Sequence, residues 1–273
     1  MTPIDEDRDV LVEAWRRDGW DAHRRIGLLV PHADVGPESE LQAMAPPGVM
    51  VHAARVRFDA MAAGGTMDPT IPLAPVRAFA ESPELDAAAE LLAAAPVDVI
   101  AFGFTSSAYV IGADGEAAMT ARLAGRTRGL PVVAASAAMA AALHELGAHR
   151  VSLVTPPWFD ADLTGLGRRY FEDAGHVVVE AAPAGLDSDQ RAITPNGLFD
   201  WICGHTPNAA EAVVIAGNGL RAVGAIAALE GALGRPVVTA NQALLWAALS
   251  ATGADVTAVH GYGQLFFASG AER

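Results

Sequence analysis

The sequence predicts an α/β protein with two pseudo-symmetric, doubly wound domains of parallel sheet and a functional site in the cleft between them. Short apolar runs alternate with segments of helical periodicity along the 273 residues, which is typical of parallel sheets with right-handed crossovers. Three segments also occur twice in the same order: residues 26–31 and 151–156, residues 98–105 and 212–219, and residues 129–143 and 234–249. The repeated unit of roughly 120 residues has the size of a domain.

The first half contains four predicted strands and the helices that connect them. The strands are expected at residues 26–31, 49–56, 97–103 and 130–135, and the helices at residues 37–45, 83–94, 113–123 and 136–147. Pro31 marks the end of the first strand because it has no N–H for a sheet ladder. Ser136 is an expected N-cap, and Gly147 an expected helix stop. Residues 61–75 predict a loop long enough to serve as a lid.

The same order of elements begins again at residue 151. We predict a first domain of residues 25–130 plus 250–273, to which the tail at residues 256–267 returns, and a second domain of residues 131–249. The exchange point is left open, because residues 130–147 lie between the repeats. Residues 1–24 predict an N-terminal helical extension, since apolar residues recur there at helical spacing among charged neighbours, namely Val10, Leu11, Ala14 and Trp15.

Composition and charge exclude several classes of function. The net charge is −14, and all 18 basic residues are Arg, so we expect no nucleic-acid partner and no anionic membrane surface. The lack of Lys excludes a Schiff base and a phosphate loop that needs Lys. No run reaches the roughly 18 apolar residues of a membrane span. The single Cys203 permits no internal disulfide and fits a reducing compartment, so we expect a cytoplasmic protein.

Polar residues follow two apolar runs where each predicted strand ends. The run at residues 98–104 leads into Thr105, Ser106 and Ser107, and the run at residues 212–216 leads into Gly217, Asn218 and Gly219. Ligands of open α/β sheets bind beyond the carboxyl ends of the strands. We therefore expect these two segments to form two walls of one site, whose hydroxyl and N–H groups bind a small carboxylate. The alternative for Thr105, Ser106 and Ser107 is simple helix capping.

Four short motifs resemble the aspartate/glutamate racemase superfamily, and within it the branch of maleate cis-trans isomerase and arylmalonate decarboxylase. They are IGLLVP at residues 26–31, GFTSS at 103–107, VSLVTP at 151–156 and GYGQLF at 261–266. The resemblance covers about residues 24–267 and implies flavodoxin-like domains that hold a carboxylate between them. It also implies chemistry without a metal or an organic cofactor, carried by one or two cysteines.

The chain departs from this family pattern at both cysteine positions. The first falls on Phe104 and the second on Gly217 or Asn218. Cys203 lies in a helical segment before the strand and is expected to be structural. Pro31 and His32, at the end of the first strand, are expected to lie beside the substrate. The resemblance implies an aromatic residue beside it as well, which is matched by Trp158 or, as the alternative, by Pro157.

Asp34 stands where the isomerase branch has Asn. As a carboxylate it would repel a bound carboxylate unless its pKa is raised or the substrate is not a dianion. It is therefore a candidate general base, with capping of the next helix as the alternative. His32 and His260 are further candidates for proton transfer, or simply packing residues.

Two functions remain open at this point. One is a cofactor-independent lyase or isomerase, similar to a decarboxylase, a cis-trans isomerase or a racemase, which acts through an enolate-type intermediate without a cysteine nucleophile. Asp34, Thr105 and Ser106 are its expected catalytic residues. The alternative is a non-catalytic protein that binds small carboxylates or has a regulatory role. Either one could form a homo-oligomer.

Overall fold

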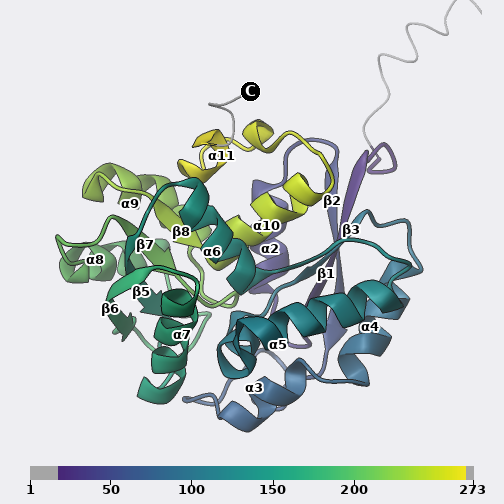
Figure 1. Ribbon diagram of the computed structural model, residues 1–273, viewed down its shortest axis with the longest axis horizontal. Coiled ribbons are helices and arrows are strands. Elements are labelled where there is room, and N and C mark those ends of the chain that lie inside the picture. The colour runs from purple at the N-terminus through teal and green to yellow at the C-terminus, as the bar shows by residue number, and fades with distance from the viewer. Residues whose placement is uncertain (1–17, 269–273) are drawn as a thin grey trace, which may run out of the picture.

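The computed structural model describes residues 18–268, and these contain two four-stranded parallel sheets (Figure 1). The first sheet has the order β2-β1-β3-β4, and the second has the order β6-β5-β7-β8. The strands are β1 (Arg24–Pro31), β2 (Val49–Val56), β3 (Val99–Phe102), β4 (Val132–Ala134), β5 (Arg150–Thr155), β6 (Val177–Pro183), β7 (Ala212–Ile215) and β8 (Val237–Thr239). The predicted α/β fold with two similar sheets is confirmed.

The sequence repeats fall on equivalent strands of the two sheets. The repeated pairs of segments contain β1 and β5, β3 and β7, and β4 and β8, which occupy the same places in the two strand orders. In each half the first strand pairs in parallel with the second and third, and the third pairs with the fourth. The carboxyl ends of equivalent strands therefore present equivalent loops.

The helices of the first half are α2 (Gly36–Met44), α3 (Leu73–Phe79), α4 (Glu84–Ala93), α5 (Thr105–Arg126) and α6 (Ala135–Glu145). Two of them, α3 and α5, differ from the prediction. The short helix α3 was not predicted. Helix α5 begins directly after β3 rather than near Asp114, and the left-handed backbone of Gly112 (φ 75°) interrupts it. This interruption explains why the periodicity of its first turns was missed.

The expected cap at Ser136 is also wrong. Residue Ala134 occupies the N-cap position of α6, and the Ser136 hydroxyl donates instead to the carbonyl of Thr105 at 3.2 Å. The predicted stop at Gly147 agrees with the structure, where this residue follows the helix with a left-handed φ of 64°. The predicted N-terminal helix rests on residues 10–15, which lie outside the described residues.

The helices of the second half are α7 (Ala161–Asp173), α8 (Pro195–His205), α9 (Ile226–Leu233), α10 (Ala240–Ala251) and the short α11 (Leu265–Ala268), with 3₁₀ turns η1 (Val223–Ala225) and η2 (Val256–Ala258). Helix α10 begins with a capping box, in which the Thr239 hydroxyl accepts from the Gln242 amide and the Gln242 side chain accepts in return. Such a box satisfies two of the first amides of a helix. It fixes the start of α10 immediately after β8.

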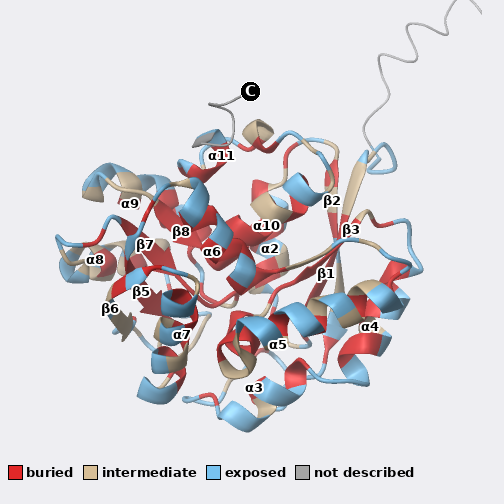
Figure 2. Ribbon diagram, viewed as in Figure 1, coloured by how far each residue is buried: buried red, intermediate tan, exposed pale blue. Residues whose placement is uncertain are grey.

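Helices from the two halves pack against each other where the sheets meet. Helix α6 packs on α10, and α5 packs on α7; in Figure 1, α6 and α10 lie between the two groups of strands. The central strands β1, β3, β5 and β7, strand β8 and the inner faces of these helices are largely buried, whereas the edge strands β2 and β6 are partly exposed (Figure 2). Strand β4 pairs with β3 in the first sheet, whereas the boundary expected after residue 130 would assign it to the second domain. The division into domains stays a prediction.

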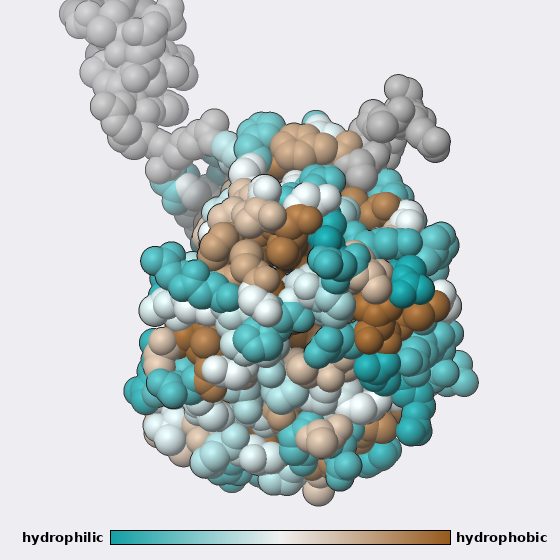
Figure 3. All heavy atoms as spheres, turned by 90° about the vertical axis from the view of Figure 1, so that its left-hand side faces the viewer, coloured by the Kyte–Doolittle hydropathy of each residue, from teal (hydrophilic) through white to brown (hydrophobic). Residues whose placement is uncertain are grey.

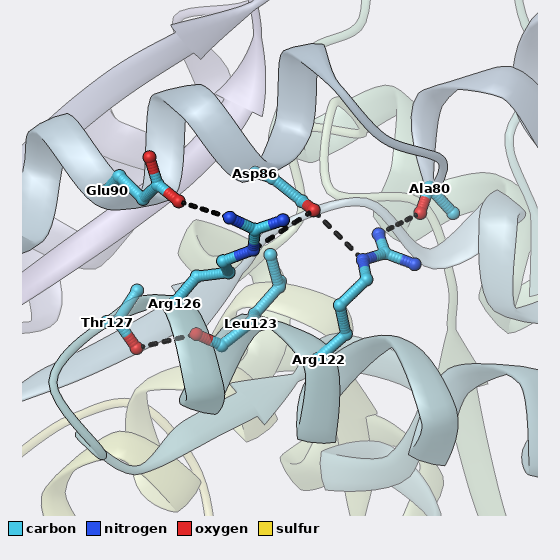
Figure 4. Close-up of polar contacts among 7 residues, drawn as sticks. All are labelled: Ala80, Asp86, Glu90, Arg122, Leu123, Arg126 and Thr127. Atoms are coloured by element: carbon cyan, nitrogen blue, oxygen red, sulfur yellow. Dashed lines mark hydrogen bonds and ion pairs between the residues drawn. The ribbon is translucent and has the colours of Figure 1, made fainter.

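An ion cluster connects α4 to α5 on the outside of the first sheet (Figure 4). The nearly buried Asp86 accepts from Arg122 Nε at 2.9 Å and lies 3.9 Å from Arg126 Nε. Arg122 also donates to the Ala80 carbonyl, and Arg126 pairs with Glu90. These contacts hold the C-terminal part of α5 while its first turn reaches the site.

The face of the molecule that carries the second sheet shows small, separate hydrophobic areas among hydrophilic ones (Figure 3). Singly exposed apolar residues such as Val177, which is 54% exposed, are ordinary on protein surfaces. Within residues 18–268, no helix is long and apolar enough to cross a membrane.

Candidate active site

A narrow cavity lies at the carboxyl ends of the strands, between the two halves of the chain. Its volume is about 20 Å³, which is room for about one water molecule. The loops after β1, β3, β5 and β7 supply most of its walls, and the loop after β2 closes it. The lining residues are Pro31, Asp34, Phe58, Met61, Met67, Ile71, Phe104, Thr105, Ser106, Trp158, Phe159, Gly217, Asn218 and Gly219.

The first wall is the start of α5. Residues Thr105 and Ser106 are buried in its first turn, where backbone N–H groups have no partner within the helix. The Thr105 N–H donates to Asn218 Oδ1 at 3.0 Å, and the Thr105 hydroxyl accepts from the Gly217 N–H at 3.2 Å. The N–H groups of Thr105 and Gly217, which we expected to face a substrate, therefore form hydrogen bonds between the two walls instead. The hydroxyls of this turn do not cap α5, so the capping alternative is wrong.

The second wall, Gly217–Gly219, follows β7 and requires glycine. Gly217 has a φ of 87°, and a Cβ atom there would lie 2.2 Å from Pro156 Cγ. A Cβ atom on Gly219 would lie 2.9 Å from Asp34 Oδ2 and 3.0 Å from Gln190 Oε1. Because glycine has no side chain, the backbone of Gly217–Gly219 can approach Asp34 closely, and the N–H groups of this segment are left unshielded.

Asp34 is the only ionisable side chain among the described residues that line the cavity. It is 5% exposed, and burial raises its pKa to about 6, while the Gly36 N–H bonded to Oδ1 at 2.8 Å and the charge of Arg55 oppose the shift. Arg55 also donates to the Asp34 backbone carbonyl and pairs with Glu38. The N-cap of α2 is Val35, so Asp34 does not cap this helix as the alternative supposed; it accepts from Gly36, the first residue of α2, and also faces the cavity.

The loop between β2 and α3 covers the cavity with apolar side chains. Phe58, Met61, Met67 and Ile71 all line it. The Ile71 N–H donates to the Trp158 carbonyl at 3.0 Å, and the Ser188 hydroxyl donates to the Pro69 carbonyl at 2.9 Å. These bonds join the loop of the first half to the second half. The length of the loop and its Gly and Pro content predicted a lid. They did not predict which of its side chains point into the cavity.

Four residues singled out in the sequence lie away from the cavity lining. The Ser107 hydroxyl is fully buried and donates to the Val76 carbonyl of α3 at 2.7 Å. His32 is exposed, and its Nδ1 accepts from the Phe58 N–H at 3.2 Å, which supports the base of the lid loop. His260 is exposed beside Phe267, and Cys203 is half-buried on α8. None of these four is among the cavity-lining residues.

The site offers hydrogen-bond donors and one carboxyl group. Phe104 lines the cavity, and its ring packs against the rings of Phe58 and Phe79 at centroid distances of 4.9 and 4.4 Å. Across residues 18–268 no group of three His, Cys, Asp or Glu residues is arranged to hold a metal ion. The arrangement can hold a small anion beside a carboxyl group of raised pKa, in a mostly apolar enclosure.

The fold has close counterparts among solved structures. A maleate isomerase from Pseudomonas putida S16, in complex with maleate, superimposes with a TM-score of 0.77 and 24% identity over 89% of this chain and 97% of that one. A mutant of arylmalonate decarboxylase in its liganded form gives 0.76 and 25%, over 89% and 98%. A mutant of the Nocardia farcinica maleate cis-trans isomerase, with a covalently bound succinylcysteine intermediate, gives 0.75 and 23%, again over 89% and 98%.

A comparison with curated proteins gave no match. The model of one protein family, described as arylmalonate decarboxylase, matches residues 26–266, which include all eight strands except the first two residues of β1, and every residue that lines the cavity. This chain therefore belongs to the arylmalonate decarboxylase family.

Proposed function

We propose that the protein is a cofactor-independent lyase or isomerase, of the decarboxylase or cis-trans isomerase kind, that acts on a small carboxylic acid. Family membership and the likeness to a maleate isomerase and an arylmalonate decarboxylase support this class. The observation that carries the proposal is the position of Asp34, a buried carboxyl group of raised pKa opposite the amides of Gly217–Gly219.

The substrate carboxylate is bound by the hydroxyl and N–H groups of the two walls. The donors still available are the Ser106 hydroxyl and the amides of Ser106, Asn218 and Gly219, none of which is paired in the described part of the chain. When a C–H or C–C bond next to the carboxylate breaks, charge moves onto its oxygens and an enolate forms. Fixed donors in an enclosed site stabilise that charge, and loss of one such donor typically costs about 100- to 1000-fold in rate.

Asp34 transfers the proton in this proposal. With a pKa of about 6, it is mainly a carboxylate at neutral pH and can accept a proton from the carbon next to the substrate carboxylate. Once protonated, it can return that proton to the enolate, or donate to the carbanion left when carbon dioxide departs. A base whose pKa is close to the working pH is effective in both directions. No cysteine takes part, since Cys203 does not line the cavity.

Opening of the lid is the expected first step. A cavity of about 20 Å³ cannot admit a carboxylic acid, so the loop that carries Phe58, Met61, Met67 and Ile71 must move before substrate enters. Closure then returns these apolar side chains over the bound substrate and excludes water, which strengthens the electrostatic interactions inside.

Asp34→Asn and Ser106→Ala test the proposal in an assay of maleate, phenylmalonate and related mono- and dicarboxylates. Asn keeps an oxygen for the Gly36 N–H but cannot transfer a proton, so we expect turnover to fall at least about 100-fold. Ser106→Ala removes a donor and should have an effect of similar order.

Two controls separate this result from loss of folding. Asp59→Asn changes an exposed carboxylate that pairs with Arg57, and Ser152→Ala changes a buried hydroxyl on β5; both variants should keep full turnover. Full activity in Asp34→Asn and Ser106→Ala would refute the proposed roles. Calorimetric binding of these acids without any turnover would identify a carboxylate-binding protein instead.

A further inference from the structure

A buried acid lies behind the second wall of the cavity. Glu40 is on α2 in the first half of the chain and is 8% exposed, but it does not line the active-site cavity. Its Oε1 accepts from the backbone N–H groups of Ala222 and Val223 at 2.7 and 3.1 Å. These residues continue the chain just after Gly217–Gly219, so Glu40 ties the second wall to the first half of the molecule.

The other oxygen of Glu40 begins a chain of hydrogen bonds that reaches the first wall. Asn241 Nδ2, on α10, donates to Glu40 Oε2 at 2.7 Å and to the Asn218 carbonyl at 2.9 Å. Asn218 Nδ2 donates to Asn241 Oδ1 at 2.7 Å, and Asn218 Oδ1 accepts from the Thr105 N–H at 3.0 Å. All four residues are buried, so each group depends on these partners.

The Glu40 carboxylate, the Asn218 carbonyl and the Thr105 N–H all require the same direction of the bonds in this chain. An ionised Glu only accepts hydrogen bonds, whereas each Asn side chain has one donating end and one accepting end. Glu40 therefore requires the NH₂ group of Asn241 on its side, which leaves the Asn241 oxygen for the NH₂ group of Asn218. That in turn leaves the Asn218 oxygen for the Thr105 N–H. Burial raises the pKa of Glu40, and the Asn241 NH₂ group and the two amides oppose this shift.

We infer that Glu40 is a positioning residue of the active site, because its bonds to Asn241 and to the amides that follow the second wall hold the Asn218 side chain and the Gly217–Gly219 amides in place against the start of α5. Its action passes through Asn241 and needs no contact with substrate. The inference concerns the geometry of the site, so it holds whichever carboxylic acid the protein uses.

The substitution Glu40→Gln gives a direct test because Gln has nearly the same shape. Its NH₂ group would face the NH₂ group of Asn241, or its oxygen would abandon the amides of Ala222 and Val223. Reversing Asn241 would turn its oxygen toward the Asn218 carbonyl, and reversing Asn218 as well would leave the Thr105 N–H facing an NH₂ group. We expect the Thr105 amide resonance to shift in NMR spectra, and its hydrogen exchange to become about tenfold faster or more, since a buried donor loses its acceptor.

Anion binding provides the second measurement. Titration with sulfate and with maleate should give dissociation constants about tenfold weaker in Glu40→Gln, because the amides of the second wall are no longer held in place. Asn241→Ala cuts the chain but leaves the bonds from Glu40 to Ala222 and Val223 intact, and it should produce the same change at Thr105.

Glu230→Gln is the matched control. Glu230 also accepts backbone N–H groups, from Val237 at 3.1 Å and Gln264 at 3.0 Å, but it lies outside the cavity lining. This variant should lose stability and keep the wild-type Thr105 amide and anion affinity. The inference is overturned if Glu40→Gln and Asn241→Ala also lose only stability. Absence of turnover with every acid would refute the proposed function and leave the Thr105 measurement intact.

Discussion

At the scale of single residues, the site depends on one carboxyl group whose charge changes close to neutral pH. Asp34 lies beside the donors that would hold a substrate carboxylate, and burial raises its pKa to about 6. Its protonated form does not repel a bound anion, whereas its ionised form does. Arg55 is the nearby cation, and Glu40 is a second buried acid that interacts with Asp34. In the proposed mechanism, binding and proton transfer therefore make opposite demands on Asp34.

We expect carboxylate binding to tighten as the pH falls through about 6. The neutral acid is favoured below this pH, so the dissociation constant of maleate should be smaller at pH 5 than at pH 8, and protons should be taken up on binding. Isothermal titration in buffers of different ionisation enthalpy measures both. In Asp34→Asn, which cannot ionise, this pH dependence should be lost. An equal pH dependence in the variant would assign it to another group or to the ligand itself.

At the scale of elements, the two ends of α5 have different tasks. Its first turn lines the cavity, and its C-terminal part is tied to α4 by the cluster around Asp86 (Figure 4). The left-handed backbone at Gly112 lies between these parts. The direction of the first turn is thus set separately from the rest of the helix, by Thr105 and its partners in the second half.

Substitution of Asp86 should weaken the attachment of α5 to α4. Asp86→Ala leaves two arginines without their shared acceptor, and we expect a loss of about 2 kcal/mol in the free energy of unfolding, measured with urea. Glu90→Gln changes an exposed partner of Arg126 and should alter that free energy by less than about 0.5 kcal/mol. Equal effects of the two variants would contradict the importance of burial at Asp86.

At the scale of the whole molecule, a further buried acid, Glu116, joins the two halves away from the cavity. Glu116 on α5 accepts from the Tyr170 hydroxyl on α7 through its Oε2, and backbone N–H groups at the start of α6 lie near its carboxyl group. Burial raises its pKa to about 7, although these donors oppose the shift. Its Oε1 and the nearby hydroxyl of Tyr109 are buried without partners in the described chain. Ionisation of Glu116 is therefore costly.

The stability of the protein should fall between pH 4.5 and 7 for this reason. The folded state binds the Glu116 proton more tightly than the unfolded state, so the stabilisation is complete below the unfolded pKa of 4.5 and is lost as pH rises through about 7. The difference between these two pKa values corresponds to a change of about 3 kcal/mol in the free energy of unfolding. Glu116→Gln should match the wild type at pH 5 and exceed it by this order at pH 8, in urea unfolding. A difference that does not vary with pH would contradict this assignment.

His176 contributes to the pH dependence with the opposite sign. Burial lowers the pKa of His176, and the neighbouring His144 adds to this effect. The contribution of neutral His176 to the stability of the fold is therefore lost as the pH falls from the unfolded pKa of 6.5. The comparison of Glu116→Gln with the wild type cancels this contribution, because His176 is present in both proteins. The same holds for Glu40 and Glu230, whose pKa values burial also raises.

Much of the candidate site could be predicted because it lies at strand ends. A buried strand is a local apolar run, and the residue that follows it is placed at the sheet edge whatever the rest of the chain does. This local rule was sufficient to select Asp34, Thr105, Ser106 and Gly217–Gly219, all of which the structure brings to one cavity. It was not sufficient for Ser107, because the direction of a side chain within a helical turn depends on what packs against it.

The sequence by itself determined the α/β class, the duplication of the sheet and the strand ends that form the walls, since these follow from periodicity within short segments. Only the tertiary structure decided which donors remain available to a substrate. Thr105 and Gly217 are 112 residues apart and satisfy each other, and Glu40 reaches Asn241 across 201 residues. No local pattern encodes such pairs, because a hydrogen bond depends on where two halves of the chain meet and not on the neighbours of either residue.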